Sequence, residues 1–153
     1  DFVGSRGLGD VYKRQLEYRS DMLCELVDLQ LSKCRLMTAT KKGSEFPATG
    51  RIRVATKYVN VARQYFASQG RQIDPIKLYG AMELAPVVGL ADVIVDVVDT
   101  GNTLKANGLE ARDLIAYSSA RLVVSRVAMK TRHQYIFPII EQFNEWVKTQ
   151  DAT

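Results

Sequence analysis

The sequence ADVIVDVV at residues 91–98 is a nearly unbroken apolar run, and the polar sequence DTGNT follows it immediately at residues 99–103. Strands this apolar are typical of parallel sheets, because helices cover a parallel sheet on both faces. The chain leaves such a strand at the carboxyl end of the sheet, where α/β proteins bind their ligands. The sequence therefore predicts a buried central strand that ends in a candidate ligand-binding turn.

Segments typical of strands and helices alternate around this run. Asn60 stands where a cap would begin one helix, and Gly70 ends that helix. From Ala120 a longer apolar run leads into a C-terminal helix, with Pro138 near its start. The alternation predicts an α/β fold with a parallel sheet covered on both faces. We expect strands at residues 33–39, 51–56, 75–79, 91–98 and 114–119, and further helices at residues 82–88 and 104–107.

One strand enters this α/β unit and another leaves it, so the chain on either side must belong to a different part of the protein. We expect residues 39–120 to form a complete second lobe. Residues 16–38 and 121–153 would form part of a first lobe. The cleft between two such lobes is where a ligand would sit.

The N-terminal sequence SRGLGDVYKRQ, from Ser5 to Gln15, resembles one reading-frame translation of a transposase adapter used in building sequencing libraries. Segments of this kind are excluded from fold reasoning. We therefore expect residues 1–15 to be an adapter-derived scar and Leu16 to be the first natural residue. The natural chain would then begin upstream, and this sequence would be a truncated fragment.

Composition excludes several classes of protein. The 153 residues are 46% hydrophobic and 25% charged, as in ordinary globular proteins, and the net charge of +4 is too small to argue for nucleic-acid binding. No run of about 18 apolar residues is present, so we expect no membrane-spanning helix. His133 is the only histidine, so a histidine-based triad or zinc site would have no second histidine in this sequence, and we expect a polar residue near a helix start. The two cysteines have no metal spacing and fit a reducing cytosol.

The turn after the apolar run has the composition of a phosphate-binding loop. It leads directly into a helix start, whose N–H groups and positive dipole end favour an anion. Gly101 lets the backbone approach a ligand closely, and the hydroxyls of Thr100 and Thr103 can donate to phosphate oxygens. Asp96 and Asp99 would repel a phosphate, so they suit sugar hydroxyls or a hydrated Mg²⁺ ion. An ordinary turn with a threonine cap remains the alternative at this point.

The sequence DVVDTGNTLKANGL resembles the phosphoribosyl-pyrophosphate loop of the ATP phosphoribosyltransferases, the first enzymes of histidine biosynthesis. The blocks CELVDLQLSKCRLMTAT, GRIRVATKYVNVARQYF, IKLYGAMELAPVVGLADVIVDVV and ARLVVSRVAMKTRH resemble that family in its own order. The resemblance runs from about Leu16 nearly to the end of the chain. Departures are mild, because Gln30 and Ser32 stand where glycines are usual and Ser125 replaces a usual asparagine.

The resemblance implies a two-lobed fold like a type II periplasmic binding protein, with the second lobe complete and the first partial. It implies that a ring nitrogen of ATP attacks the anomeric carbon of phosphoribosyl pyrophosphate and expels Mg²⁺-bound pyrophosphate. Such a reaction requires positioning and charge stabilisation rather than a nucleophile, so no catalytic residue is assigned. The substrate-binding residues would be Asp96, Asp99, Thr100, Gly101, Asn102, Thr103 and Leu104, with Glu83 as a second polar contact.

The roles of three residues, Glu83, Arg35 and Lys57, are each open to two interpretations. Glu83 is either a contact in the cleft or a favourable acid in the first turn of a helix. Arg35 and Lys57 either meet phosphates or are solvated or structural charges.

The chain ends soon after its C-terminal helix, which resembles the short form of the enzyme. That form implies a separate regulatory subunit similar to histidyl-tRNA synthetase, a hetero-oligomer and a cytoplasmic location. With part of the first lobe absent, we expect the fragment itself to be inactive. The alternative function is a non-catalytic domain of the same fold that binds a small ligand, as in a solute receptor or sensor. The phosphate loop preceded by acids favours the enzyme.

Overall fold

The computed structural model describes residues 23–150, so the expected adapter-derived segment and Leu16 lie outside the described residues. The chain divides into two compact units, which are described separately. The central unit comprises Cys34–Tyr117, and the described part of the outer unit comprises residues 23–33 together with residues 118–150. The central unit begins at Cys34 rather than at residue 39 and ends at Tyr117 rather than at residue 120. Its first strand pairs within this unit from Arg35 onwards.

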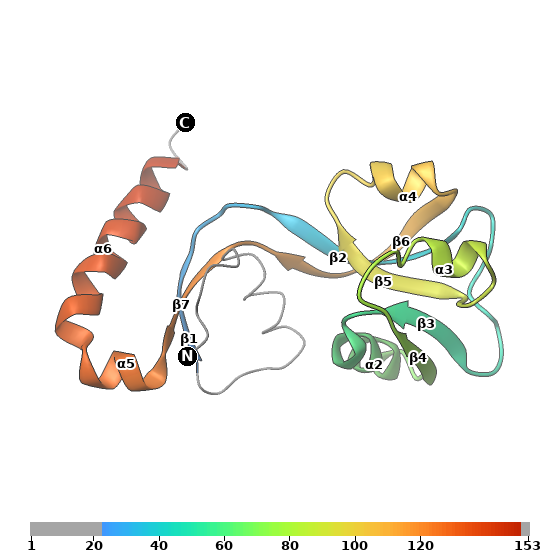
Figure 1. Ribbon diagram of the computed structural model, residues 1–153, viewed down its shortest axis with the longest axis horizontal. Coiled ribbons are helices and arrows are strands. Elements are labelled where there is room, and N and C mark those ends of the chain that lie inside the picture. The colour runs from blue at the N-terminus through green and yellow to red at the C-terminus, as the bar shows by residue number, and fades with distance from the viewer. Residues whose placement is uncertain (1–22, 151–153) are drawn as a thin grey trace. The chain divides into compact units, whose positions relative to one another are not determined.

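Figure 1 labels the helices and strands. In the central unit they are β2 (Cys34–Lys41), β3 (Ile52–Thr56), α2 (Val59–Ser68), β4 (Ile73–Lys77), α3 (Leu84–Val87), β5 (Val93–Val98), α4 (Asn102–Ala106) and β6 (Leu109–Ser118). In the outer unit they are β1 (Leu23–Asp28), β7 (Arg121–Ser125), α5 (Arg126–Thr131) and α6 (His133–Gln150).

The central unit contains a five-stranded sheet in the order β4-β3-β5-β2-β6. β3 runs parallel to both β4 and β5, as the sequence predicts. β2 runs antiparallel to β5, so the prediction of a wholly parallel sheet is wrong for this strand. Parallel neighbours need a crossover connection, usually a helix. β2 instead enters the unit directly from the outer unit, without a crossover that would impose the parallel direction.

Helices cover both faces of this sheet, which explains the apolar composition of β5 (Figure 1). Val93 and Val95 pack into one core cluster with Phe66 of α2. Ile94 and Val98 pack on the other side, in a cluster that includes Leu104 of α4. Successive side chains of a strand point to opposite faces. Both sets of β5 side chains are therefore buried, and the predicted two-sided burial is confirmed.

Several element boundaries differ from the expected ones. α2 begins at Val59 after the N-cap residue Tyr58, so Asn60 is not the cap. The Tyr58 N–H instead donates to the buried Thr56 hydroxyl at 2.9 Å. β4 begins at Ile73, two residues earlier than expected, and tolerates Pro75 because it is an edge strand of its sheet. β6 begins at Leu109 instead of residue 114, because it pairs along β2 at the other edge.

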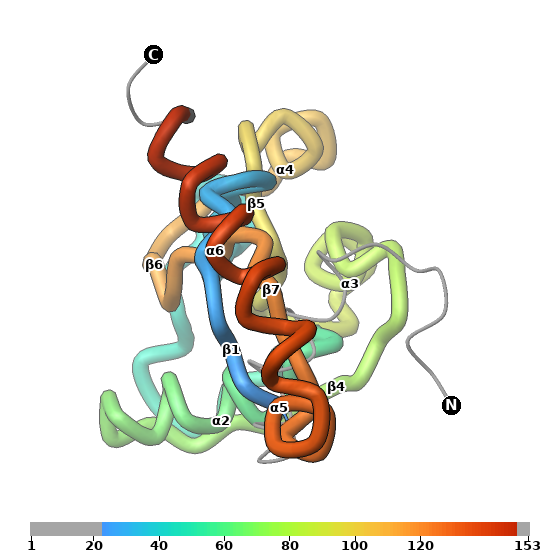
Figure 2. The backbone as a smooth tube through the Cα atoms, turned by 90° about the vertical axis from the view of Figure 1, so that its left-hand side faces the viewer, coloured from blue at the N-terminus to red at the C-terminus, as the bar shows by residue number. Residues whose placement is uncertain are grey.

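The outer unit consists of the antiparallel pair β1 and β7 with α5 and α6 beside it (Figure 2). Ile140, Phe143 and Val147 of α6 pack against a small core that contains Val27 and Leu29. α6 begins at His133, which confirms the prediction of a polar residue at a helix start. Pro138 therefore lies inside α6 rather than near its start.

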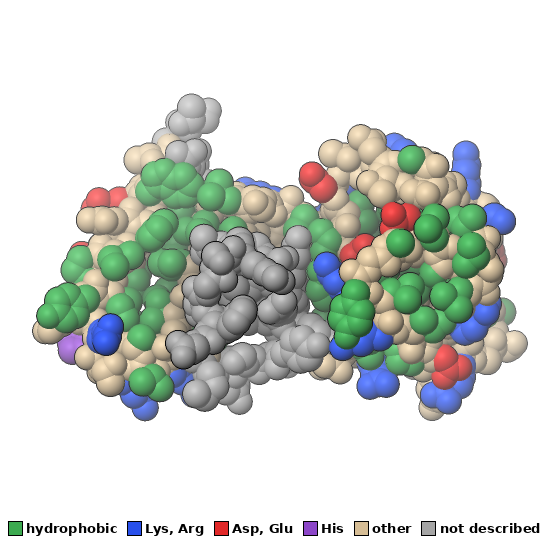
Figure 3. Space-filling model, in the orientation of Figure 1, with side chains coloured by type: hydrophobic (Ala, Val, Ile, Leu, Met, Phe, Trp, Pro, Cys, Tyr) green, Lys and Arg blue, Asp and Glu red, His purple; other side chains and the backbone are tan. Residues whose placement is uncertain are grey.

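The outward side of α6 keeps large apolar side chains in contact with solvent (Figure 3). Tyr135 is 68% exposed and Ile139 is 49% exposed. No helix among the described residues combines the length and the apolar character needed to cross a membrane.

The three departures from the family pattern have structural counterparts. Gln30 and Ser32 adopt left-handed backbone conformations, with φ angles of 58° and 49°. The chain therefore keeps a conformation that favours glycine without the glycines. Ser125 is the N-cap of α5, and its hydroxyl accepts a hydrogen bond of 3.1 Å from the N–H of Ala128. Serine and asparagine cap helices about equally well, so this replacement keeps the local structure.

Candidate functional site

The turn after β5 is built around Gly101. Its φ angle is 81°, a left-handed conformation that glycine adopts readily, and it occupies the N-cap position of the five-residue helix α4. Because glycine has no side chain, the N-cap residue makes no side-chain capping bond to this helix. The Thr100 hydroxyl accepts only a long hydrogen bond of 3.4 Å from the N–H of Asn102. This bond closes a weak threonine turn before α4, of the kind that the sequence left open as the alternative.

The N–H groups at the start of α4 are available to a ligand. The first backbone hydrogen bond of this helix runs from the N–H of Lys105 to the carbonyl oxygen of Gly101, at 3.1 Å. Within the described part of the chain, the N–H groups of Gly101, Thr103 and Leu104 have no acceptor. Unpaired N–H groups at a helix start favour an anion. The loop therefore presents the donors that a phosphate would need.

The side chain of Leu104 anchors this loop to the sheet. It is 7% exposed and belongs to the core cluster that contains Ile94 and Val98 of β5. At the other end of α4, the Asn107 side-chain amide donates to the Thr103 carbonyl oxygen at 2.9 Å. Leu104 thus contributes its backbone N–H to the loop, while its side chain has a structural role.

Arg35 ties the loop to the neighbouring strand β2. Its Nη2 atom donates a hydrogen bond of 3.0 Å to the carbonyl oxygen of Asp99. In the register of β2 against β5, Arg35 is opposite Val98, the last residue of β5. Of the two cations that the sequence singled out, Arg35 therefore lies at the loop. Lys57 instead places its Nζ atom 5.2 Å from the ring centroid of Tyr58.

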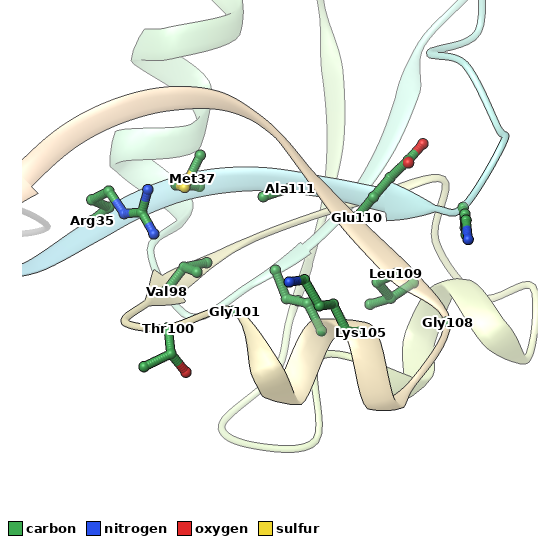
Figure 4. Close-up of a pocket in the computed structure, with 12 residues that line it drawn as sticks. Arg35, Met37, Val98, Thr100, Gly101, Lys105, Gly108, Leu109, Glu110 and Ala111 are labelled. Atoms are coloured by element: carbon green, nitrogen blue, oxygen red, sulfur yellow. The ribbon is translucent and has the colours of Figure 1, made fainter.

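A pocket of about 570 Å³ lies between α4 and the strands β2 and β6 (Figure 4). Thr100, Gly101 and Leu104 of the predicted loop line it. Its other lining residues are Arg35, Met37, Lys42, Val98, Lys105, Gly108, Leu109, Glu110 and Ala111.

The pocket has an excess of positive charge. Arg35, Lys42 and Lys105 contribute cationic side chains, and Lys105 extends from α4 toward the strands (Figure 4). The carboxylate of Glu110 forms an ion pair of 2.8 Å with Arg112 and accepts a hydrogen bond of 3.2 Å from the N–H of Gly43. The one acid of the lining is therefore already neutralised by protein groups, and the pocket favours an anionic ligand.

The predicted acids lie near the loop but outside the lining of this pocket. Asp96 is half-buried on β5, and the strand alternation directs it to the same face as Ile94 and Val98. Asp99 is exposed directly before Thr100. Asn102 and Thr103, at the start of α4, are also exposed and also lie outside the pocket lining.

Glu83 lies immediately before α3, in the N-cap position, and its side chain makes no capping hydrogen bond. It is half-buried beside Met82, which belongs to the core cluster on the α4 side of the sheet. Glu83 is therefore not an acid within the first turn of a helix, because that turn contains none.

The cations Lys42 and Lys105 were not identified from the sequence as pocket residues. Lys105 lies two residues after the sequence DTGNT, on the helix that follows it. Its position in the sequence alone could therefore have indicated a pocket residue. Lys42 reaches the pocket because β2 runs antiparallel to β5 and ends beside Gly108, to which the Lys42 N–H donates at 2.9 Å. The described residues contain no group of three or more His, Cys, Asp or Glu side chains that could hold a metal ion.

Comparisons with known proteins agree on one family. A family model described as ATP phosphoribosyltransferase (HisG) matches residues 9–145. The ATP phosphoribosyltransferase of Marinobacter nauticus is 64% identical over 133 residues, which are 87% of this chain and 62% of that protein. The enzyme of Ectopseudomonas mendocina is 59% identical over 139 residues, which are 90% of this chain and 65% of that protein. The chain thus spans less than two thirds of the length of these relatives.

Solved structures show the fold. The ATP phosphoribosyl transferase (HisG:HisZ) complex from Thermotoga maritima matches 90% of this chain and 67% of its own chain, with a TM-score of 0.81 and 34% identity. An arginine transport periplasmic binding protein from Legionella pneumophila covers 89% of this chain with a TM-score of 0.58 and 10% identity, which shows the fold alone. The expected α/β fold like a periplasmic binding protein is confirmed. By its sequence and its fold, the chain belongs to the ATP phosphoribosyltransferase family.

Proposed function

We propose that the protein to which this chain corresponds condenses ATP with 5-phosphoribosyl 1-pyrophosphate, giving phosphoribosyl-ATP and pyrophosphate in the first step of histidine biosynthesis. The observation that carries this proposal is the loop of residues 100–104, whose unpaired N–H groups adjoin a cationic pocket in a chain of this family. The solute-binding neighbours share 10% to 15% identity with this chain, so they do not favour the alternative of a non-catalytic receptor.

In this proposal the loop binds the 5-phosphate of the donor substrate. The N–H groups of Thr103 and Leu104 and the hydroxyls of Thr100 and Thr103 donate to phosphate oxygens. Asp96 and Asp99 accept hydrogen bonds from the ribose hydroxyls, because their negative charge excludes them from contact with the phosphate. The sugar is thereby fixed with its anomeric carbon directed away from the loop, toward the incoming nucleotide.

The reaction itself requires little acid–base chemistry. A ring nitrogen of ATP carries a free lone pair and attacks the anomeric carbon, while the bond to pyrophosphate breaks and the leaving group takes the electron pair. Positioning of the two substrates lowers the barrier, and cations stabilise the charge on the leaving group. We propose that Mg²⁺ enters as part of the substrate, bound to its pyrophosphate. The donor set fits this arrangement, since the described residues gather no three-carboxylate or His/Cys site of their own.

We propose that the complete enzyme works in the cytoplasm as a hetero-oligomer with a regulatory subunit similar to histidyl-tRNA synthetase. The neighbour from Thermotoga maritima is a HisG:HisZ complex, which supports a separate partner subunit. Glu83 is proposed as a second polar contact to the substrates, because it is half-buried and makes no capping bond to α3.

The test is an assay of phosphoribosyl-ATP formation by the complete gene product, with and without the regulatory subunit. Thr103→Ala should reduce kcat/KM for phosphoribosyl pyrophosphate. The expected loss of transition-state stabilisation is about 1.5 to 3 kcal/mol, the value of a hydrogen bond to a charged group. Thr131→Ala, in α5 of the outer unit, is the matched control and should leave kcat/KM unchanged. Equal kinetics for Thr103→Ala and the wild type would contradict the role of the loop. The 153-residue chain spans less than two thirds of its relatives and should form no product by itself, and measurable turnover by it would contradict this expectation.

A further inference from the structure

Arg35 is the cation that the structure connects directly to the loop. Its position opposite Val98 places it beside the end of β5, and its Nη2 atom donates to the Asp99 carbonyl oxygen at 3.0 Å. Figure 4 shows its side chain directed from β2 toward the side of Val98 and Thr100. Arg35 therefore contacts the first peptide group of the loop.

This hydrogen bond fixes the direction of that peptide group. A trans peptide is planar, so the carbonyl of Asp99 and the N–H of Thr100 point in opposite directions. When Arg35 directs the Asp99 oxygen toward β2, the Thr100 N–H must point away from β2. Gly101 follows at once in its left-handed conformation, and α4 begins after it. The peptide that Arg35 holds therefore lies directly before Gly101 and the start of α4.

No carboxylate among residues 23–150 forms an ion pair with Arg35. Four other arginines of the described chain form ion pairs with acids, at 2.6 to 3.0 Å; these are Arg51, Arg53, Arg112 and Arg121. Arg35 forms no such pair with a described residue, and its hydrogen-bond acceptor is an uncharged carbonyl. Its charge therefore adds to the wall of the pocket that Thr100 and Gly101 also line.

The other two cations of the pocket lack this combination of features. Lys42 and Lys105 line the pocket, but no described hydrogen bond connects their ammonium groups to the loop. A lysine is a point charge on a flexible stem, whereas the guanidinium is a planar fork that can bond a carbonyl with one N–H group and keep the others for a ligand. Arg35 is the pocket cation that both orients the loop and carries charge beside it.

We propose that Arg35 is a positioning residue of the phosphoribosyl site: it orients the Asp99–Thr100 peptide for binding of a sugar 5-phosphate and places its positive charge beside that phosphate. This inference rests on the proposed function, since it assumes that the loop binds a phosphorylated ribose. It adds a residue from β2, a strand outside the motif, to the site.

The experiment uses the 153-residue chain and ribose 5-phosphate as the probe, with ribose as the probe that lacks the phosphate. Binding is measured by NMR titration for the wild type, Arg35→Met and Arg35→Lys. Arg51→Met is the matched control, because it removes an equal charge from an exposed ion pair with Asp74. Thermal melting of each variant reports whether it folds, and the ¹⁵N heteronuclear NOE of residues 99–104 reports the order of the loop.

We expect the wild type to bind ribose 5-phosphate and to bind ribose far more weakly. Arg35→Met should weaken binding of ribose 5-phosphate at least about tenfold, the equivalent of one charge-assisted hydrogen bond. It should also lower the heteronuclear NOE of the loop in the free protein. Arg35→Lys should recover part of the affinity through its charge without restoring the order of the loop. Arg51→Met should match the wild type in both measurements.

The outcomes separate this inference from the function on which it rests. A folded wild type that does not bind ribose 5-phosphate would overturn both. Binding by the wild type with equal affinity in Arg35→Met would overturn only the role of Arg35. Weaker binding with an unchanged loop NOE would overturn the positioning role and leave a purely electrostatic one. If Arg35→Met does not fold, Arg35→Lys carries the test, and wild-type affinity with wild-type loop order in that variant would contradict the inference.

Discussion

The side chains of Arg53 on β3 and Asp92 before β5 form a two-point ion pair across the parallel part of the central sheet. The Nη2 and Nε atoms of Arg53 lie 2.6 Å and 3.2 Å from the two carboxylate oxygens of Asp92. The backbone N–H of Arg53 also donates to Asp92 at 2.9 Å. The pair thus fixes the register of β3 against β5, the strand that leads to the loop.

Asp92→Asn should lower the free energy of unfolding by about 1 kcal/mol, the upper range for a partly exposed ion pair with good geometry. Chemical denaturation measures this change. Asp74→Asn is the control, because its pair with Arg51 is a single contact of 3.0 Å between side chains that are more than half exposed. Equal effects of the two substitutions would show that the geometry of the Arg53 pair adds nothing to stability.

The carboxyl of Asp28 gives a prediction of pH dependence. Burial alone would raise its pKa, but hydrogen bonds from the Ser119 hydroxyl and the Gln30 N–H, together with the charge of Arg121, lower the pKa overall. A folded-state pKa below the unfolded one stabilises the protein above about pH 4, and this stabilisation is lost as the pH falls through the folded pKa. Asp28→Asn should therefore flatten the loss of stability below about pH 4.

Ser119 is the strongest of the groups that lower the pKa of Asp28, with a hydrogen bond of 2.7 Å. Ser119→Ala should raise the pKa of Asp28 toward its ordinary value, because the hydroxyl donor to the charged form is lost. Carboxyl ¹³C shifts followed against pH measure this directly, and Ser44→Ala in the central unit serves as the control. An unchanged titration of Asp28 in Ser119→Ala would contradict the assigned cause.

Ser32 gives a prediction about backbone strain. Its φ angle of 49° lies in the left-handed region, where a residue with a Cβ atom is disfavoured by about 1 kcal/mol or more. Ser32→Gly should therefore be more stable than Ser32→Ala by about 1 kcal/mol in chemical denaturation. Ser44, which has no positive φ, is the comparison site, and there glycine should not be the more stable substitution. The same order at both sites would contradict the left-handed conformation of Ser32.

Leu104 tests the anchoring of the loop. Leu104→Ala should cost about 2 to 3 kcal/mol of stability, at the lower end for a buried leucine because the short helix α4 can move to fill the space. Leu114 on β6 is 41% exposed, so Leu114→Ala should cost much less. Thermal and chemical unfolding compare the two variants. A similar small cost for both would show that Leu104 does not anchor the loop.

The sequence predicted the parts of this structure that depend on local pattern. The apolar run of β5 indicated burial on both faces, and the turn residues Thr100, Gly101 and Leu104 do line a pocket. The direction of β2 was not predictable, because the alternation of one strand is the same for parallel and antiparallel pairing. The cations Arg35 and Lys42 reach the pocket through that pairing. Their positions therefore depend on tertiary structure, which no local motif encodes.

The cap of α2 shows the same limit at a smaller scale. Asn60 has the composition of a cap, but the buried Thr56 hydroxyl already accepts the N–H of Tyr58 and starts the helix earlier. A buried hydrogen bond from the end of a strand thus overrides a surface propensity.

A crystal structure of the complete protein with phosphoribosyl pyrophosphate tests the role of the loop most directly. We expect the 5-phosphate oxygens within about 2.7 to 3.2 Å of the backbone nitrogens of Thr103 and Leu104, which are normal hydrogen-bond distances. We also expect the hydrogen bond from Arg35 to the Asp99 carbonyl oxygen to be retained. A 5-phosphate bound elsewhere, or protein groups of the complete protein that occupy those two N–H groups, would contradict the role of the loop.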